Sequence, residues 1–312
     1  MTKSQEKYRL LCQENYIPWY ATDWWLNTLC GPQNWEVFFA EDSKGQILGA
    51  LPVCQRRIAG IRLFLQPALT AYLHIWIKPP TSERAVYQNN RSQRILQDLA
   101  KQIPMAPLFD LQFDESLQNA LPFHWQGFKN TLRYTYQFSD LSEPAKIYRE
   151  MESSARNHIR KASDLLQIDP NAPATVLLDL VRKSMNRKNI AFRLTTERFQ
   201  EITENIQQHA TLKIYAAYNQ EQEPQAAIAV IWDAKRASFW LSGSSQAGRK
   251  SGAIYLLLWA AIKEAAKKDL IFDFEGSMAP SVEAVFRSFG ATRTPYYRLY
   301  RAKPRILSLL RI

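Results

Sequence analysis

Residues 270–300 read LIFDFEGSMAPSVEAVFRSFGATRTPYYRLY, and residues 108–136 repeat their pattern as LFDLQFDESLQNALPFHWQGFKNTLRYTY. Each stretch begins with an alternating apolar run, continues through a helix-like segment to a glycine, and ends in a second alternating run. Alternation with a period of two is typical of a strand, and glycine often follows the last turn of a helix. The two stretches therefore predict the same strand–helix–strand unit twice in one chain.

Identical residues at one spacing support an internal duplication. Both halves also contain a strand–turn–strand pattern, WEVFFAEDSKGQILGALPVCQ at 35–55 and LKIYAAYNQEQEPQAAIAVIWD at 212–233. We predict two tandem units, residues 1–140 and 141–312, that meet at the turn-forming segment FSDLSEPAK. Three identical pairs lie 163 residues apart: Gly127 with Gly290, Thr131 with Thr294, and Tyr134 with Tyr297.

The second half shows a mixed α/β order of elements, with an antiparallel meander followed by helix, strand, helix and strand. This order predicts a mixed-sheet fold of the α+β kind. Helices are expected near 144–168, 174–187, 195–208, 250–268 and 281–288, and strands near 211–219, 225–233, 236–243, 270–275 and 295–301.

Composition places the chain among folded proteins with an anionic partner. With 312 residues, 46% of them hydrophobic, the chain can form two cores. No apolar run is long enough to span a membrane and no signal peptide is evident, so we expect a cytoplasmic protein. The net charge of +11 favours a phosphorylated cofactor, a nucleotide-linked substrate, RNA or an anionic membrane surface. A basic surface that only maintains solubility explains the charge equally well.

The cysteines and histidines give no sign of a metal or nucleophile site. Cys12, Cys30 and Cys54 lack metal-ligand spacing, so we expect reduced structural thiols and no metal. No histidine has a neighbour that suggests a catalytic triad. The basic and apolar tail RAKPRILSLLRI could lie on an anionic membrane, although packing on the body of the protein is the simpler expectation.

Short motifs resemble the Fem-type peptidyltransferases and their bacterial relatives in the GNAT acyltransferase superfamily. The motifs are SARNHIRKA (154–162), FDFEGS (272–277) followed by VFRSFGA (285–291), and QGFKNTLRYTY (126–136). The resemblance covers nearly the whole chain. It implies two tandem GNAT-like units of the acyl-CoA N-acyltransferase fold, and transfer of an acyl or aminoacyl group to an amine.

The sequence departs from the Fem-type pattern in two ways. No segment has enough heptads for the long coiled-coil arm that Fem-type enzymes often carry. Arg287 stands where the family's F-K-x-x-F-G motif has its lysine. Arginine keeps the positive charge but cannot act as a base near neutral pH. The resemblance therefore implies that Arg287 stabilises the oxyanion and does not transfer a proton.

The segment SGSSQAGRKSG (242–252) is the candidate donor site. It joins a strand to a helix, and the free N–H groups at a helix start attract anions. Glycines would let a phosphate approach the backbone, and in GNAT enzymes this place binds the cofactor pyrophosphate. The alternative is a flexible turn with solvated basic residues. The candidate residues are Ser244, Gly248, Arg249, Lys250, Ser251 and Gly252.

Candidates for the acceptor site and for catalysis lie on three other segments. Arg156, Arg160 and Lys161 could bind substrate phosphate or carboxylate, or could form a solvated helix face. Asp273 and Glu275 are expected on one face of a strand, Asp273 to bind substrate and Glu275 as the base or as the group that orients the ammonium. A salt bridge to Arg287 or Arg293 is the alternative. Tyr297 is a candidate acid for the leaving thiolate, or a structural aromatic.

We therefore expect an N-acyltransferase that moves an acyl group from acyl-CoA to the amine of a small or peptide-like acceptor. The resemblance also implies a second possibility, aminoacyl transfer from aminoacyl-tRNA to a cell-wall precursor. A catalytically silent module that binds nucleic acid or a membrane surface is a third. Neither a metal nor a covalent enzyme intermediate is expected, and no DNA partner.

Overall fold

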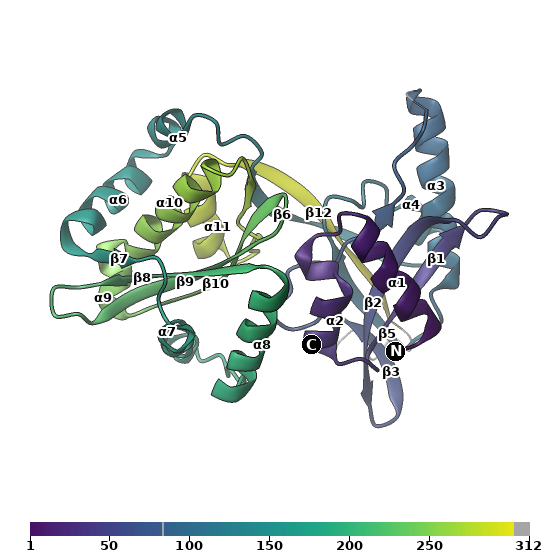
Figure 1. Ribbon diagram of the computed structural model, residues 1–312, viewed down its shortest axis with the longest axis horizontal. Coiled ribbons are helices and arrows are strands. Elements are labelled where there is room, and N and C mark those ends of the chain that lie inside the picture. The colour runs from purple at the N-terminus through teal and green to yellow at the C-terminus, as the bar shows by residue number, and fades with distance from the viewer. Residues whose placement is uncertain (83, 303–312) are drawn as a thin grey trace. The chain divides into compact units, whose positions relative to one another are not determined.

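The computed structural model describes residues 1–82 and 84–302, so most of the basic tail lies outside the described residues. The chain divides into two compact units (Figure 1). The first contains residues 1–133 and the last strand from residue 295, and the second contains residues 134–294.

The first unit is a mixed sheet with a core rich in aromatic residues. Strand β1 (Trp35–Glu41) pairs antiparallel with β2 (Ile47–Ile58), which also pairs with β3 (Ile61–Leu65) and β4 (Trp76–Ile77). Strand β5 (Leu108–Phe113) runs parallel to β3 and antiparallel to residues 297–302 of β12 (Thr292–Ala302). The helices of this unit are α1 (Lys3–Glu14), η1 (Trp19–Ala21), α2 (Asp23–Cys30), α3 (Ala85–Gln102) and α4 (Leu121–His124).

The second unit is a sheet in the order β6-β11-β10-β9-β8-β7, with helices on both faces (Figure 1). All its neighbouring strands are antiparallel except β10 and β11. Helices α6 and α10 cover one face, and α7 and α8 cover the other. The strands are β6 (Lys129–Phe138), β7 (Gln167–Asp169), β8 (Thr211–Tyr218), β9 (Pro224–Trp232), β10 (Arg236–Ser244) and β11 (Ile271–Asp273). The helices are α5 (Pro144–Glu150), α6 (Ser153–Leu165), α7 (Ala174–Arg187), α8 (Thr196–His209), α9 (Gln246–Ser251), α10 (Ala253–Ala266) and α11 (Pro280–Ser288).

Strand pairing places the final strand of each half differently from the sequence-based division at residue 140. Residues 137 and 138 of β6 pair with β11 and group with the second unit. Residues 297–302 of β12 pair with β5 and group with the first unit, although they come last in the sequence. Hydrogen bonds between strands that are far apart in the chain decide this grouping, and local sequence patterns do not report them.

Two predicted helices are interrupted. The helix expected near 144–168 is broken at Met151, where the backbone is extended, and the guanidinium of Arg156 donates a 2.7 Å hydrogen bond to the carbonyl of Arg149. This bond satisfies a carbonyl that the end of α5 leaves free. The helix expected near 250–268 is divided at Gly252, whose φ of +82° lies in the left-handed region.

Glycine at position 243 is required by the contact between β10 and α7. A Cβ atom at this position would lie 2.2 Å from the carbonyl carbon of Leu180 and from the nitrogen of Val181. Backbone atoms cannot move aside as a flexible side chain can, so β10 would have to separate from α7.

Gly243→Ala should therefore lower the free energy of unfolding by about 3 kcal/mol, the upper part of the range for overpacked cores. Urea denaturation followed by circular dichroism measures the loss. The control is Ser242→Ala at the neighbouring, half-buried position, which should change stability by less than about 0.5 kcal/mol. Equal free energies of unfolding for the two variants would show that the α7 backbone can move away from β10 at little energetic cost.

Candidate functional site

A groove of about 690 Å³ opens at the turn between β10 and α9 in the second unit. An adjoining hollow of about 490 Å³ shares Lys183 and Ser245 with it and continues along α7 to Arg187. The groove lies between the end of α6, the turn joining β8 to β9, and the start of α9. Its lining residues are Leu165, Leu166, Lys183, Asn219, Gln220, Glu221, Glu223, Pro224, Gln225, Ser245, Ala247 and Ser251.

The predicted donor segment forms the wall of this groove, and its first turn is capped. Ser245 is the N-cap of α9, and its hydroxyl accepts a 2.9 Å hydrogen bond from the N–H of Gly248. The N–H groups of Gln246 and Ala247 also belong to the first turn, where a helix supplies no acceptor. The segment therefore directs amide hydrogens towards its surroundings, as an anion site requires.

The glycines of this segment are needed for contacts within the protein. A Cβ atom at Gly248 would lie 2.0 Å from the carbonyl oxygen of Gln225, and one at Gly252 would lie 2.9 Å from the Cβ of His158. The sequence suggested that these glycines leave room for a phosphate. The structure shows instead that they allow the turn to pack closely on β9 and α6.

The cations that line the groove and its hollow come from α7. Lys183 lines both cavities, and Arg187 lines the hollow and donates a 2.7 Å hydrogen bond to the carbonyl of Ser244. Arg249 and Lys250 are exposed on α9 but are not among the lining residues. Lys183 and Arg187 were not predicted from the sequence, since they precede Ser245 by about sixty residues. The only local indication of a role at this site was their position near the end of the helix predicted at 174–187.

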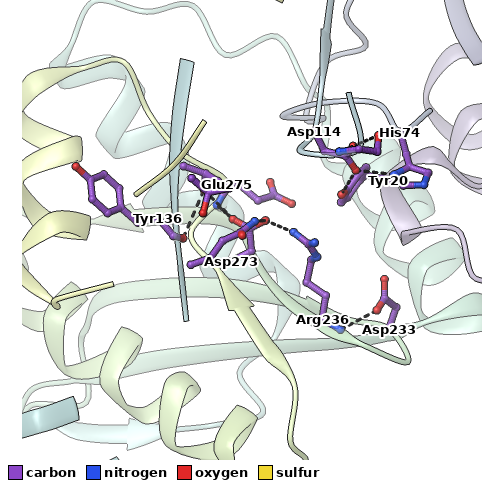
Figure 2. Close-up of polar contacts among 12 residues, drawn as sticks. Tyr20, His74, Asp114, Tyr136, Asp233, Arg236, Asp273 and Glu275 are labelled. Carbon is purple, nitrogen blue, oxygen red and sulfur yellow. Dashed lines mark hydrogen bonds and ion pairs between the residues drawn. The ribbon is translucent and has the colours of Figure 1, made fainter. Parts of the chain in front are cut away.

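Asp273 lies at the centre of a buried polar network (Figure 2). Its side chain is fully buried and forms a 2.5 Å ion pair with Arg236. Thr135 and Gln137 of β6 donate to its two carboxylate oxygens at 2.7 and 3.0 Å. The salt bridge considered from the sequence therefore exists, but its cation is Arg236 and not Arg287 or Arg293. A buried charge needs such partners, so this carboxylate has a structural role.

Glu275 is not on the strand where it was expected. Strand β11 ends at Asp273, and Glu275 adopts a φ of +55° in the loop that follows. Its side chain is buried, and its Oε1 atom has no hydrogen-bond partner within residues 1–82 and 84–302. Burial and the nearby charge of Asp273 raise the pKa of Glu275 well above its usual value, against a smaller lowering by Arg236. The shift favours the protonated form of this carboxyl group over the ionised form that a general base needs.

Arg287 is exposed on α11 and takes part in two ion pairs. Its guanidinium lies 3.1 Å from Glu152 and 3.3 Å from Glu283, and its side chain is 54% exposed. Glu283 also accepts a hydrogen bond from the hydroxyl of Tyr136. Exposed ion pairs contribute about 0–1 kcal/mol, so the guanidinium can exchange these partners for a ligand at little cost.

The other candidates are dispersed. Arg160 and Lys161 are exposed on α6, where Arg160 donates to Asn157 at 3.0 Å and Lys161 to the carbonyl of Lys250 at 3.5 Å. The half-buried Tyr297 of β12 pairs with Phe113 and belongs to the first unit. The structure therefore does not gather all the predicted site residues in one cavity.

A histidine–aspartate pair in the first unit has no counterpart in the sequence predictions. Nδ1 of His74 lies 2.8 Å from Asp114, which also accepts a 2.7 Å hydrogen bond from the hydroxyl of Tyr20 (Figure 2). Burial alone would raise the pKa of Asp114, but His74, Ser116 and Tyr20 together lower it to about 2. The two residues are forty positions apart, so local spacing could not reveal the pair.

Comparisons with known proteins agree with this architecture. Residues 149–280 match the family model of the Acetyltransferase (GNAT) domain. The chain is similar in structure to FemX, with a TM-score of 0.63 and 10% identity over 95% of this chain and 96% of FemX. It is also similar to L-PGS from Bacillus licheniformis, with a TM-score of 0.54 and 14% identity over 97% of this chain and 93% of that one. No protein with a curated description matches the sequence.

A tandem GNAT protein from the clavulanic acid biosynthesis pathway is a further structural neighbour. Its TM-score is 0.50, with 10% identity over 95% of this chain and 92% of that one. At such low identities the neighbours establish the fold. The predictions of an α/β fold with tandem GNAT-like units and of similarity to the Fem-type group are confirmed, and the chain is an acyltransferase. Within residues 1–82 and 84–302, every helix is too short or too polar to cross a membrane.

The protonation state of Glu275 leads to a pH prediction. A carboxyl group whose pKa is raised on folding adds full stability below its unfolded pKa of about 4.3, and this stability is lost as pH rises through the folded value. Glu275→Gln mimics the protonated form. The variant should therefore gain stability relative to the parent protein as pH increases from about 5 upwards.

Urea unfolding at a series of pH values tests this expectation, with Glu221→Gln in the exposed β8–β9 turn as the control. The control should differ in stability from the parent protein by less than about 0.5 kcal/mol. A constant difference between Glu275→Gln and the parent protein would mean that the buried carboxyl group is ionised.

Proposed function

We propose that the protein transfers an acyl group from acyl-CoA to the amine of a small or peptide-like acceptor. The observation that carries this proposal is the groove at the start of α9, where a capped helix turn and Lys183 form part of the lining, together with the adjoining hollow that Lys183 and Arg187 line. Amide hydrogens together with Lys183 and Arg187 suit a pyrophosphate. Ser244, Gly248, Ser251 and Gly252 shape or line the turn, and Arg249 and Lys250 add charge beside it.

The part of β10 beyond its pairing with β11 is a suitable binding place for the thioester arm of the donor. The two strands pair only over Arg236–Ser238, and β10 then continues to Ser244 with a bulge between Phe239 and Leu241. Beyond residue 238 the side of β10 that faced β11 has no neighbouring strand among the described residues. Backbone N–H and C=O groups on a strand edge can bind an extended amide-containing chain.

The chemistry that we propose is direct attack of a neutral amine on the thioester carbonyl. The oxyanion that forms would be stabilised by backbone N–H groups and by Arg287, once this residue releases Glu152 and Glu283. The raised pKa of Glu275 suits donation of its proton to the leaving thiolate. The proton that the amine nitrogen loses would then return to the Glu275 carboxylate, so the carboxyl group would be regenerated. Arg156, Arg160, Lys161 and Asp273 as substrate ligands, and Tyr297 as an acid, stay predictions from the sequence. Of these, Asp273 has the least support, because its carboxylate is buried and paired.

Donor binding is tested by calorimetric titration with acetyl-CoA at about 150 mM salt, where non-specific electrostatic attraction is reduced. We expect saturable micromolar binding. Lys183→Glu and Arg187→Glu should each weaken it about tenfold or more, since each loses one charge-assisted contact and adds repulsion. Charge reversal at both Arg249 and Lys250 should have a smaller effect, because these residues do not line the groove.

The matched control is Lys267→Glu, an exposed lysine just after α10 in the same unit. It makes the same change of net charge away from the groove and should leave the affinity unchanged. Equal losses of acetyl-CoA affinity in the control and in Lys183→Glu would mean that overall charge causes the effect. The groove would then be excluded as the donor site.

Arg287 provides the catalytic prediction. Arg287→Ala should lower kcat by about 100-fold with acyl-CoA affinity retained, the effect of removing one oxyanion donor. Arg287→Lys should restore part of the rate, because it keeps the charge that the Fem-type motif places there. Turnover of a panel of amine acceptors, followed by release of free CoA thiol, measures both. Unchanged turnover in Arg287→Ala would exclude the assigned role.

Aminoacyl transfer from aminoacyl-tRNA is the second candidate. The fold likeness to FemX, which covers nearly all of both chains, and the net charge of +11 favour it. Titration with aminoacylated tRNA in place of acetyl-CoA separates the two donors. Binding of tRNA alone, with transfer of its amino acid, would replace the acyl-CoA proposal.

A further inference from the structure

Two cysteine thiols of the first unit are in direct contact. Cys30 is the last residue of α2, and Cys54 lies in β2. Both are free thiols, and their sulfur atoms are 2.9 Å apart. The third cysteine, Cys12 in α1, is not part of this contact. The fold thus brings together two thiols from different elements, twenty-four positions apart.

The geometry of the pair distinguishes oxidation from metal binding. Two thiolates bound to one tetrahedral zinc ion, with Zn–S bonds of about 2.3 Å, lie about 3.8 Å apart. The sulfur atoms of Cys30 and Cys54 are closer than this. The described part of the chain also contains no cluster of three or more histidine, cysteine or acidic side chains that could hold a metal. The contact is therefore suited to a sulfur–sulfur bond and not to a shared ion.

The two thiols differ in access to solvent. Cys30 is half-buried, whereas Cys54 is only 2% exposed. Burial, followed by the contact with Cys30, raises the pKa of the Cys54 thiol well above its ordinary value. A reagent in solution therefore meets Cys30 first, and Cys54 can act only on a sulfur that is already beside it.

Hydrogen bonds hold the backbone on the Cys30 side of the pair in place. The side-chain amide of Asn34 donates a 2.8 Å hydrogen bond to the carbonyl of Cys30, and the N–H of Gly31 donates to Asn27 at 3.0 Å. Trp35 donates from its indole to Asn27 at 2.8 Å, which ties the start of β1 to α2. A bond between the two sulfur atoms requires little movement of these elements.

We propose that Cys30 and Cys54 form a dithiol modification site that a small-molecule disulfide, such as oxidised glutathione, converts into an intramolecular disulfide. The thiolate of Cys30 attacks one sulfur of the reagent, and the first glutathione leaves as a thiolate. Cys54 then loses its proton and attacks the Cys30 sulfur of the mixed disulfide, releasing the second glutathione. Two protein thiols are oxidised by two electrons in total, and one reagent disulfide is reduced to two thiols.

The link would constrain residues 30–54, the segment that contains β1 and most of β2. A loop of this size restricts the unfolded chain, so oxidation should raise the melting temperature by about 5–10 °C. The proposed donor groove belongs to the second unit, so acetyl-CoA affinity should be the same in both forms. This inference therefore stands or fails independently of the proposed function.

The experiment equilibrates the full-length protein with buffers of defined ratios of oxidised to reduced glutathione. Free thiols are then alkylated, and peptides are identified by mass spectrometry. We expect a linked Cys30–Cys54 peptide that dithiothreitol reverses, with Cys12 alkylated throughout. Cys12→Ser should behave as the parent protein, and Cys30→Ser should prevent both the link and the rise in melting temperature.

Cys54→Ser is the most informative variant, because Cys30 should then retain a stable mixed disulfide with glutathione. If burial of serine prevents folding of that variant, the parent protein alone still decides the question. A stable glutathione adduct on Cys30 in the parent protein, a link that involves Cys12, or complete alkylation of all three cysteines under oxidising buffers would each overturn the proposal.

Discussion

The ion pair between Arg236 and Asp273 is the constraint that organises the second unit. It joins the first residue of β10 to the last residue of β11, and two side chains of β6 donate to the same carboxylate. Three strands are thereby fixed around one buried charge, which would be costly to leave without its partners. Strands β10 and β11 pair in parallel only beside this ion pair, over Arg236–Ser238. The C-terminal end of β10 is therefore free to diverge from β11. The groove at Ser245 lies at that end.

Three arginine residues of the second unit donate hydrogen bonds to groups within the protein. Arg156 donates to a carbonyl at the end of α5, Arg187 to a carbonyl at the end of β10, and Arg236 to a buried carboxylate. A motif rich in arginine is therefore a weak guide to substrate binding, because helix ends and buried carboxylates compete for the same fork of donors. Arg287 differs, since its partners are the exposed Glu152 and the half-buried Glu283, and its own side chain remains half in solvent.

The elements that local periodicity describes could be predicted from the sequence. The helix expected at 174–187 has these bounds in α7, and the strands of the meander agree to within about a residue at most ends. The breaks at Met151 and Gly252 were missed, because the apolar stripe continues across both. The site was predicted only in part. The turn at 242–252 does border the groove, but Lys183, Arg187 and the pair of His74 with Asp114 depend on contacts between distant segments. The contact of Cys30 with Cys54 was missed for the same reason.

The exchange of final strands makes each half of the chain depend on the other. A fragment that stops at residue 140 would lack residues 297–302, which pair with β5, and a fragment that starts at 141 would lack the part of β6 that pairs with β11. Each half would expose an unpaired sheet edge, which favours aggregation. Neither half can therefore be made alone without the loss of a strand that the other half supplies, and the two must be synthesised as one chain to complete both sheets.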